Sequence, residues 1–372
     1  MRNRRKMIKA LLLFFKDVHE KSGKSYYFLL NDFVHLKKTK KISIEEYTNF
    51  EFENQGREFR DTFMSEMEQR PCLDLLNPKK YYTIARNKYF SHLFLEAKSI
   101  RKSELYCYYH PEGRLKNDHV AYDYESVVEV LKSKEVHSCV IKTTESSHGD
   151  GVIVVNKIKY INEKCILYLF NGRVLELKDI LKEYEPLIFE SVISQTEQFK
   201  KFNSSSVNTV RFMTTLYPTG NAKIIAIWMK FGRPGACVDN AGAGGNIDAA
   251  VDIETGKIYN VTQFNGWGKT KPITHHPDSG VLLEGIFIEN WEDIKRDVLR
   301  FQESLPYLKA IGWDIAITPE GPLVVEMNDY WDRTGQLFIR KGWKKEIQDC
   351  YEQWKKLEKE GKVSYKMGRS YE

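Results

Sequence analysis

The six cysteines of this 372-residue chain are scattered, and no two of them stand at a C-x-x-C spacing. This distribution argues against a zinc site or a disulfide framework and fits a reducing compartment. No Walker A pattern, Gly-x-Ser-x-Gly elbow or Cys/His pairing occurs, which argues against a P-loop enzyme and a covalent nucleophile. No basic stripe is interleaved with stacking aromatics, so a nucleic-acid partner is not expected.

No apolar run approaches the length needed to cross a bilayer. The chain has 42% hydrophobic and 29% charged residues, the composition of a soluble globular protein. Its N-terminus has five basic residues between positions 2 and 9, followed by an apolar stretch at 10–15. That stretch is too short for a signal peptide and no cleavage site follows. Two interpretations stay open for residues 1–16, a helix packed on the fold and a basic amphipathic helix in peripheral contact with a membrane.

Residues 1–80 have a mostly helical pattern that ends near Pro71 and Pro78, and this pattern continues through 81–95. Farther along, strand-like runs alternate with separate helical segments, and the chain is strand-rich from Val207 onward. A helix is expected at 291–305 and a charged helix at 344–360. Strand runs with segregated helices predict the α+β class.

The segment 312–328 predicts a β-hairpin, with two apolar strands joined by a Pro-Glu-Gly turn. Asp314 lies in the first strand, and Glu326 and Asn328 lie two residues apart, on one face of the second. Antiparallel pairing would bring these three oxygen donors together, a set that suits Mg²⁺. The alternative is an amphipathic hairpin whose polar ends face solvent, but burying these groups unpartnered would cost several kcal/mol.

A Ser/Gly loop follows the strand that ends at Lys142. A lysine beside such a loop can bind a phosphate while hydroxyls and backbone N–H groups cover the remaining oxygens. An ordinary hairpin turn between two strands is an equally good interpretation of the loop alone. The candidate phosphate contacts are Lys142, Ser146, Ser147, Gly149 and Gly151.

Other polar residues stand near predicted strands. Glu190 ends a buried strand where the chain becomes a linker, a place that can bind the edge of adenine. Taken alone, the segment favours an edge strand with one exposed glutamate. Arg211 lies in a predicted strand and can stabilise developing negative charge; a surface salt bridge is the alternative. A further polar series and its glycines could contact a substrate or mark a loop without a ligand: Asn208, Lys230, Arg233, Asp239, Asn240, Gly244 and Gly245.

Taken in order, these motifs resemble the ATP-grasp superfamily, and most of all its branch associated with sugar transfer and polysaccharide biosynthesis. The resemblance covers about residues 81–335. It implies an ATP-grasp fold in which two α+β subdomains clamp ATP, preceded by a mostly helical region. The implied parts are 1–80, the helical N-terminal region; 81–190, the lid part with the phosphate loop; 191–340, the C-terminal subdomain with the metal site; and 341–372, the closing helix and tail.

The resemblance also implies roles for individual residues. Lys88 and Lys142 would contact the phosphates or the adenine side of ATP, and Glu190 with Val192 would bind adenine. Lys230 matches a phosphate-binding lysine, and Arg211 would stabilise the transferring phosphoryl group. Asp314, Glu326 and Asn328 would hold Mg²⁺.

The implied function is an ATP- and Mg²⁺-dependent carboxylate–amine ligase that works through an acyl phosphate, in cell-surface polysaccharide biosynthesis or modification. Its partners would be small-molecule or saccharide carboxylates and amines. Two alternatives stay open, a phosphotransferase with a hydroxyl acceptor and a nucleotide-binding accessory protein of a glycosyltransferase. The expected location is the cytoplasm, with peripheral contact at the inner face of the membrane through residues 1–16 as an open alternative.

Overall fold

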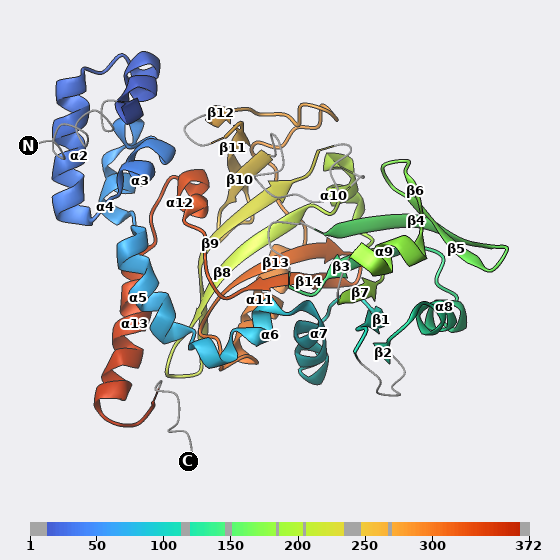
Figure 1. The fold of residues 1–372 in the computed structure, drawn as a ribbon. Coiled ribbons are helices and arrows are strands. Elements are labelled where there is room, and N and C mark those ends of the chain that lie inside the picture. Colours follow the sequence, from blue (N-terminus) through green and yellow to red (C-terminus); the bar gives the residue numbers. More distant parts are fainter. Residues whose placement is uncertain are drawn as a thin grey trace, which may run out of the picture.

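The computed structural model describes residues 13–112, 120–145, 151–183, 186–203, 206–233, 247–266 and 270–364. Within these ranges the chain forms a helical N-terminal module and two seven-stranded sheets (Figure 1). Among the described residues, none of the helices combines the length and the apolar character that a bilayer crossing requires.

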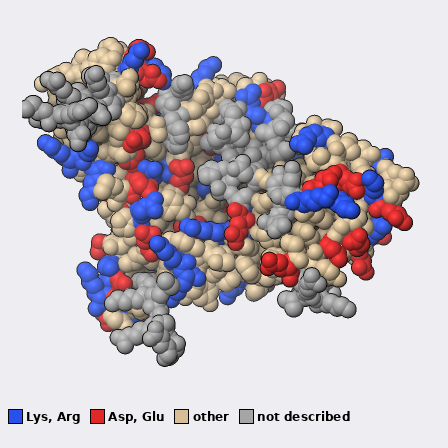
Figure 2. All heavy atoms as spheres, in the orientation of Figure 1, with Lys and Arg blue, Asp and Glu red and all other residues tan. Residues whose placement is uncertain are grey.

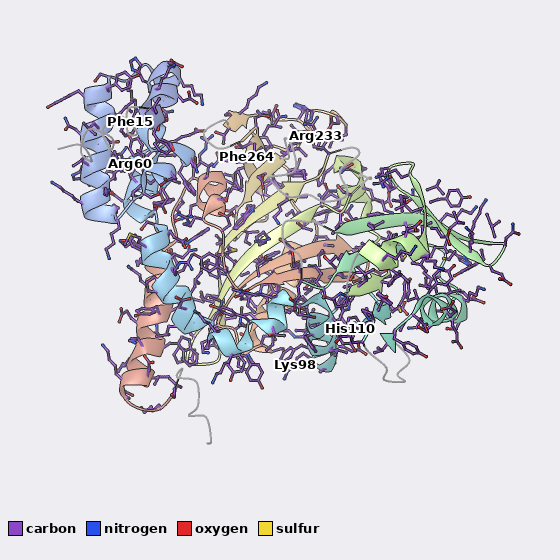
Figure 3. The ribbon with its side chains drawn as sticks, in the orientation of Figure 1. Phe15, Arg60, Lys98, His110, Arg233 and Phe264 are labelled. Atoms are coloured by element: carbon purple, nitrogen blue, oxygen red, sulfur yellow. The ribbon has the colours of Figure 1, made fainter. Side chains whose placement is uncertain are left out.

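The N-terminal module consists of a helical segment at residues 13–22 and the elements that follow it up to residue 62. Its core is rich in aromatic rings, and Phe15 contacts both Phe33 and Tyr47. Figure 3 shows Phe15 and Arg60 inside this group of helices. The module's further elements are α2 (Tyr26–Lys40), α3 (Ile44–Asn49), η1 (Phe52–Asn54) and α4 (Arg57–Thr62).

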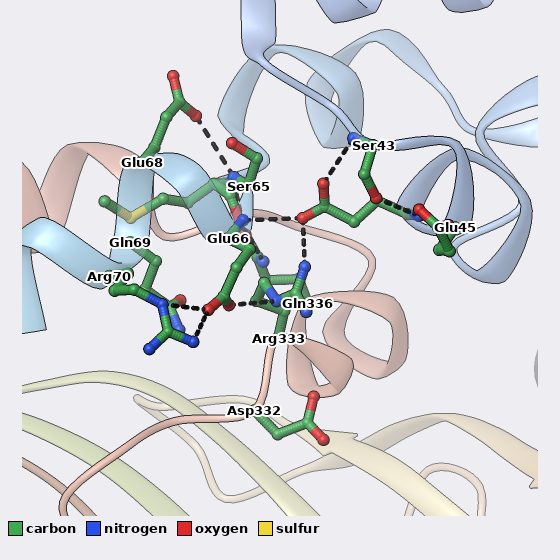
Figure 4. Close-up of polar contacts among 12 residues, drawn as sticks. Ser43, Glu45, Ser65, Glu66, Glu68, Gln69, Arg70, Asp332, Arg333 and Gln336 are labelled. Atoms are coloured by element: carbon green, nitrogen blue, oxygen red, sulfur yellow. Dashed lines mark hydrogen bonds and ion pairs between the residues drawn. The ribbon is translucent and has the colours of Figure 1, made fainter. Parts of the chain in front are cut away.

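The module is attached to the rest of the molecule through α5 (Glu66–Leu76) and α12 (Thr334–Ile339). Arg333 forms ion pairs with Glu46 of α3 and Glu66 of α5 (Figure 4). Contact at Gly342 is so close that an added Cβ would lie 1.9 Å from the carbonyl oxygen of Thr62. The junction is therefore both charged and tightly packed.

The helical pattern expected for residues 1–80 is confirmed over the described part, with one correction. Pro71 does not end a helix but lies inside α5, which continues to Leu76. Ser65 and Glu68 form a capping box that starts this helix.

The first sheet lies in the middle third of the chain, in the strand order β2-β1-β7-β3-β4-β5-β6. All its neighbouring strands pair antiparallel except β1 with β2. Its strands are β1 (Leu105–Tyr109), β2 (Val120–Ala121), β3 (Cys139–Thr143), β4 (Val152–Ile161), β5 (Lys164–Leu169), β6 (Val174–Glu176) and β7 (Leu187–Glu190). Helices α8 (Tyr124–Ser133) and α9 (Leu177–Glu183) pack on it.

The second sheet has the order β12-β11-β10-β9-β8-β13-β14, and every pair of neighbours is antiparallel. Its strands are β8 (Thr209–Leu216), β9 (Ala222–Phe231), β10 (Ile247–Val251), β11 (Ile258–Phe264), β12 (Thr270–Pro272), β13 (Ala310–Thr318) and β14 (Gly321–Asn328). Every residue of β8 and β13 is buried. These two strands therefore form the centre of the molecule.

Helices cover both faces of the second sheet, which explains why its central strands are apolar throughout. On one face lies α11 (Trp291–Glu303), whose buried residues Trp291, Ile294 and Val298 recur at helical spacing. On the other face, α5, α12 and α13 (Lys344–Lys359) pack with Trp331 and Trp343. The remaining elements are η2 (Lys79–Tyr81), α6 (Thr83–Arg86), α7 (Lys88–Ala97) and α10 (Glu197–Phe202).

Candidate functional site

A pocket lies where the two sheets approach each other. Lys142 of β3 and Glu190 of β7 line it from the first sheet, Glu326 of β14 lines it from the second, and Lys88 and His92 of α7 complete the wall. The cavity volume is about 30 Å³, which has room for about two water molecules, and one side is open to solvent. Residues 81–95 were expected to form a continuous helix, and the break in that pattern is what places Lys88 here.

Lys88 reaches the pocket because Asn87 interrupts the helix. Asn87 adopts an extended conformation, and its side chain accepts a hydrogen bond from the backbone N–H of Phe90, so that α7 begins at Lys88. The backbone N–H of Lys88 donates to the carbonyl oxygen of Thr144 (2.9 Å), and the Asn87 amide donates to Glu145 (3.0 Å). Burial lowers the pKa of Lys88, while Glu326 opposes that shift. Lys88 is thereby fixed beside the chain that leads into the Ser/Gly loop.

Glu190 lies at the end of β7 and is the centre of a buried polar cluster. Its Oε2 accepts hydrogen bonds from Ser103 Oγ (2.8 Å) and lies 2.8 Å from His92 Nε2, and its Oε1 forms an ion pair with Lys142. Burial by itself raises the pKa of Glu190, but Lys142 and His92 outweigh it and bring the pKa down to about 2. The Glu190 carboxylate thus already has three side chains of the protein as hydrogen-bond or ion-pair partners.

This arrangement bears on how adenine could be bound. With its carboxylate engaged, Glu190 has the role of holding Lys142, whereas Val192 is 47% exposed two residues later. The Ser191 backbone N–H donates to Glu104 (2.9 Å), which ties the linker to the start of β1. Adenine binding by Glu190 and Val192 stays a prediction; Glu190 lines the pocket, whereas Val192 is not among its lining residues.

Asp314 is the centre of a second buried cluster, in the second sheet. Asp314 stands directly opposite Arg211 of β8 and Glu326 of β14 in the strand register. Arg211 binds both of its carboxylate oxygens, with Nη2 2.6 Å from Oδ2. Lys230 of β9 lies 3.1 Å from Oδ1 and 3.3 Å from Oδ2. Burial raises the pKa of Asp314, but Arg211 and then Lys230 outweigh it and hold the pKa at about 2.

Glu326 and Asn328 differ from Asp314 in their surroundings. Both are half-buried on β14, and the Glu326 carboxylate forms no ion pair or hydrogen bond with side chains in the described part of the chain. The side-chain Nδ2 of Asn328 donates a hydrogen bond to the backbone carbonyl oxygen of Gly312 (3.3 Å). The side-chain Oδ1 of Asn328 can then serve as a metal ligand. Carboxylate and amide oxygens are the ligands that Mg²⁺ prefers.

The donor set therefore fits a divalent cation at Glu326 and Asn328. Asp314 could join them only as a carboxylate shared with Arg211 and Lys230. Within the described ranges, no three His, Cys, Asp or Glu residues converge as a metal site. The candidate set has two carboxylates and one amide, and Arg211 and Lys230 already neutralise the Asp314 carboxylate.

The other predicted residues fall into four groups. Asn208 is fully buried, and its amide bonds to Gln195, to backbone oxygens of residues 199 and 203 and to the Gly232 N–H, so it binds the protein itself. Arg233 forms an ion pair with Asp278 (Nη2–Oδ1 2.6 Å) and is not among the residues that line the Lys88 pocket. Figure 3 shows it apart from Lys98, which directly follows α7. Gly151 has a φ of +74°, and an added Cβ would lie 2.9 Å from Thr143. The following lie outside the described residues: Ser146, Ser147, Gly149, Asp239, Asn240, Gly244 and Gly245.

Two residues that contact Glu190 in the pocket were not predicted from the sequence, His92 and Ser103. His92 lies four positions after Lys88, so helical periodicity places both on the same face of α7 and could have identified it. Ser103 lies between α7 and β1, and its sequence surroundings contain no signal of its contact with Glu190.

Comparison with known proteins identifies the family. A family model described as sugar-transfer associated ATP-grasp matches residues 70–351. The chain belongs to this ATP-grasp family. Its fold is the α+β ATP-grasp fold, with a helical region in front of the two sheets. A search of curated protein sequences found no match.

Solved structures that resemble this ATP-grasp chain have low sequence identity. A D-Ala:D-Ser ligase, VanG from Enterococcus faecalis, is 10% identical with a TM-score of 0.43, over 72% of this chain and 61% of that chain. Biotin carboxylase from Campylobacter jejuni is 8% identical with a TM-score of 0.44, over 74% and 48%. The D-alanine–D-alanine ligase from Bacillus anthracis is 13% identical with a TM-score of 0.38, over 75% and 70%. The matched regions span about half to three fifths of the first similar structures.

Proposed function

We propose that this ATP-grasp protein is an ATP- and Mg²⁺-dependent carboxylate–amine ligase that works through an acyl phosphate. The observation that carries the proposal is the convergence of Lys88 and Lys142 with Glu326 in a pocket between two sheets. Two ammonium groups suit a polyphosphate. The Glu326 carboxylate, which forms no hydrogen bond or ion pair with side chains of the described residues, suits the metal that accompanies it. Membership of an ATP-grasp family supports ATP as the nucleotide.

Each buried cluster would then have a positioning task. Glu190 holds the ammonium of Lys142 at the pocket, and Asp314 orients the guanidinium of Arg211 and the ammonium of Lys230. Catalysis of phosphoryl transfer depends mainly on such positioning and on fixed positive charge. Arg211 would stabilise the transferring phosphoryl group. Glu326 and Asn328 would hold Mg²⁺, which supplies neutralising charge to the phosphates when it is bound.

The reaction proceeds in two steps. A carboxylate oxygen of the first substrate attacks the γ-phosphorus of ATP, the bond to the β,γ-bridging oxygen breaks, and ADP leaves. The amine of the second substrate then attacks the carbonyl carbon of the acyl phosphate, inorganic phosphate leaves, and the nitrogen loses a proton. The product is an amide, and the family description supports a saccharide or its precursor as one substrate. The location would be the cytoplasm, and contact of residues 1–16 with the inner face of the membrane belongs to the same proposal.

Hydroxylamine trapping tests the acyl phosphate directly. The full chain is incubated with Mg·ATP, hydroxylamine and single carboxylates from a panel of uronic acids and amino acids. ADP release together with a hydroxamic acid, identified by mass spectrometry, supports the ligase. A stable phosphate ester without hydroxamate would point to a hydroxyl acceptor, and ATP binding without ADP release across the panel would point to an accessory protein. Either result contradicts the proposal.

The first prediction concerns Glu326→Gln. The variant keeps the shape of the side chain but loses the charge that would bind Mg²⁺, so ADP release is expected to fall about 10²–10³-fold or more. Glu320→Gln in the turn of the same hairpin is the matched control, since Glu320 is exposed and its partners, Thr318 and Arg101, do not line the pocket. Turnover is measured as ADP release, and folding is checked by circular dichroism. Equal turnover in the two variants would rule out the metal assignment.

A further inference from the structure

Helix α2 has an apolar outer face as well as a buried one. Leu29, Phe33 and Leu36 are buried in the module's core. On the opposite face, Tyr27 (78% exposed), Leu30 (42%) and Val34 (39%) follow one another at helical spacing. In Figure 1, α2 forms the outer edge of the module, and α3 and α4 separate it from the two sheets. The exposed row therefore faces away from the pocket.

Basic residues continue this row at the end of the helix. Lys37, Lys38 and Lys41 are exposed, and none of them forms an ion pair within the described part of the chain. The one acidic residue of α2, Asp32, is turned inward, where it accepts a hydrogen bond from Tyr47 (2.8 Å) and forms an ion pair with Arg60. The outer face thus combines apolar and positively charged side chains, with no negative charge from its own helix.

The charge of the whole chain is concentrated in the same region. Residues 1–42 contain 12 Lys and Arg against three Asp and Glu, a net charge of +9. The whole chain has a net charge of +6, so the remaining 330 residues have a net charge of −3. Figure 2 shows basic side chains at the left edge of the molecule in this region. Residues 43–62 of the module have six Asp and Glu against two Lys and Arg, so residues 13–62 together have no net charge. Within the described module the positive charge lies on α2 and its C-cap, where residues 26–41 have four lysines against Asp32.

We propose that the outer face of α2 docks on an anionic lipid bilayer, with the helix lying in the plane of the membrane. A row of Tyr, Leu and Val beside lysines matches an interfacial helix, whose apolar side chains enter the headgroup region while the ammonium groups contact lipid phosphates. A stable protein partner would need about 800 Å² on this side. One row on a single 15-residue helix is too narrow for that area. The proposal extends membrane contact from residues 1–16 to α2, and it does not depend on the reaction catalysed.

Vesicle co-sedimentation of the full chain tests the docking. Vesicles of phosphatidylcholine alone are compared with an equal mixture of phosphatidylcholine and phosphatidylglycerol. Binding is expected only to the anionic vesicles and should weaken as salt is added. The triple variant Lys37→Gln, Lys38→Gln, Lys41→Gln should bind about a hundredfold more weakly, because each lysine contributes roughly a fivefold gain at an anionic surface.

A second triple variant removes the apolar row, with Tyr27→Ser, Leu30→Ser and Val34→Ser. It should also lose binding, because hydrophobic insertion and charge act together in an interfacial helix. The matched controls are Lys157→Gln, Lys159→Gln and Lys178→Gln, which are exposed lysines of β4 and α9, and the exposed pair Val174→Ser and Phe287→Ser. All variants should keep the circular dichroism spectrum and the ADP release of the parent, since none of these residues lines the pocket.

Three results would overturn the docking proposal. The first is vesicle binding by both α2 variants at the level of the parent. The second is loss of binding only when Arg2, Arg4 and Arg5 are changed to Gln, which would assign the contact to residues 1–16. The third is retention on polyglutamate without binding to anionic vesicles, which would indicate an acidic protein partner. Because ADP release is measured separately, failure of the docking proposal and failure of the ligase proposal are distinguishable.

Discussion

Two regions of this ATP-grasp protein bury carboxylates with opposite consequences. At the site, Glu190 and Asp314 are each surrounded by positively charged partners, and both have a pKa of about 2. In the N-terminal module, Glu53 is 7% exposed, its Oε2 has no hydrogen-bond partner, and burial raises its pKa to about 7. Burial alone favours the neutral acid, whereas burial beside a lysine or arginine favours the anion. The site therefore holds fixed charges, and the module holds an acid that is easily neutralised.

The largest effect on stability is expected for Asp314→Asn. The change leaves Arg211 and Lys230 buried without the charge between them, and breaking a buried pair in this way costs about 3–5 kcal/mol. The free energy of unfolding is measured in urea. Asp297→Asn is the control, because its pair with Arg300 lies on the surface of α11 and should contribute less than about 1 kcal/mol. Similar losses in the two variants would contradict the difference between buried and exposed pairs.

A smaller loss, about 2–3 kcal/mol, is expected for Glu190→Gln. The amide still bonds to Ser103 and His92, and the side chain of Lys142 is 12% exposed, so that water partly compensates its charge. Glu176→Gln is the control within the same sheet, because its partner Lys164 is 60% exposed. Urea unfolding of both variants provides the measurement, and a gain in stability for Glu190→Gln would refute the role of the ion pair.

Glu53→Gln should raise the free energy of unfolding, whereas the two preceding variants lower it. At pH 8 the parent protein must keep a buried charge at this position, and the amide removes that cost, so we expect a gain of about 2 kcal/mol. Thermal and urea unfolding at pH 8 measure it, with exposed Glu45→Gln in the same module as the control. A destabilised variant would show that the Glu53 charge has a partner in solution.

The smallest effects are expected in how the free energy of unfolding changes with pH. The pKa of Glu190 is lowered from its ordinary value of 4.5, so its contribution to stability is complete above that value and is lost as the pH falls towards 2. The pKa of Glu53 is raised from 4.5, so its contribution is complete below that value and is lost as the pH rises through about 7. The free energy of unfolding of the parent should therefore approach that of Glu190→Gln as the pH falls from 4.5 towards 2. Between pH 5 and 8 it should fall increasingly below that of Glu53→Gln. Parallel curves for the parent and either variant would exclude that group as the titrating one.

The hairpin of β13 and β14 could be predicted because its signals are local. Two apolar strands and a turn sequence identify it, and the expected antiparallel pairing is confirmed. A bulge between Asp314 and Ile315 brings Asp314 opposite Glu326, a shift of one residue that the turn alone does not determine. The α+β class is also confirmed. It could be predicted because the periodicity of helices and strands is visible within short segments. The boundary at Asn87 was missed, because the apolar pattern of α6 continues into α7 and only the side-chain cap separates them.

The charge partners of the site could not be predicted in this way. The contacts of Glu190 with His92 and Lys142 connect α7, β3 and β7. No local sequence pattern predicts that β7 pairs with β3. The same holds for Lys230, which meets Asp314 because β8 lies between β9 and β13. A hypothesis of direct ligand binding by these residues is natural when their partners are unknown.

The sequence by itself therefore determined the elements, the hairpin with its three oxygen donors and the positive charge of the first 42 residues, because each is a property of neighbouring positions. Only the tertiary structure decided which charged side chains form ion pairs with one another and which face the pocket. Arg211 and Asp314 are 103 positions apart and share a hydrogen bond, whereas Glu326, opposite Asp314 on the next strand, faces the pocket. Electrostatic pairing depends on distance in space and on burial, and both arise only when the sheets assemble.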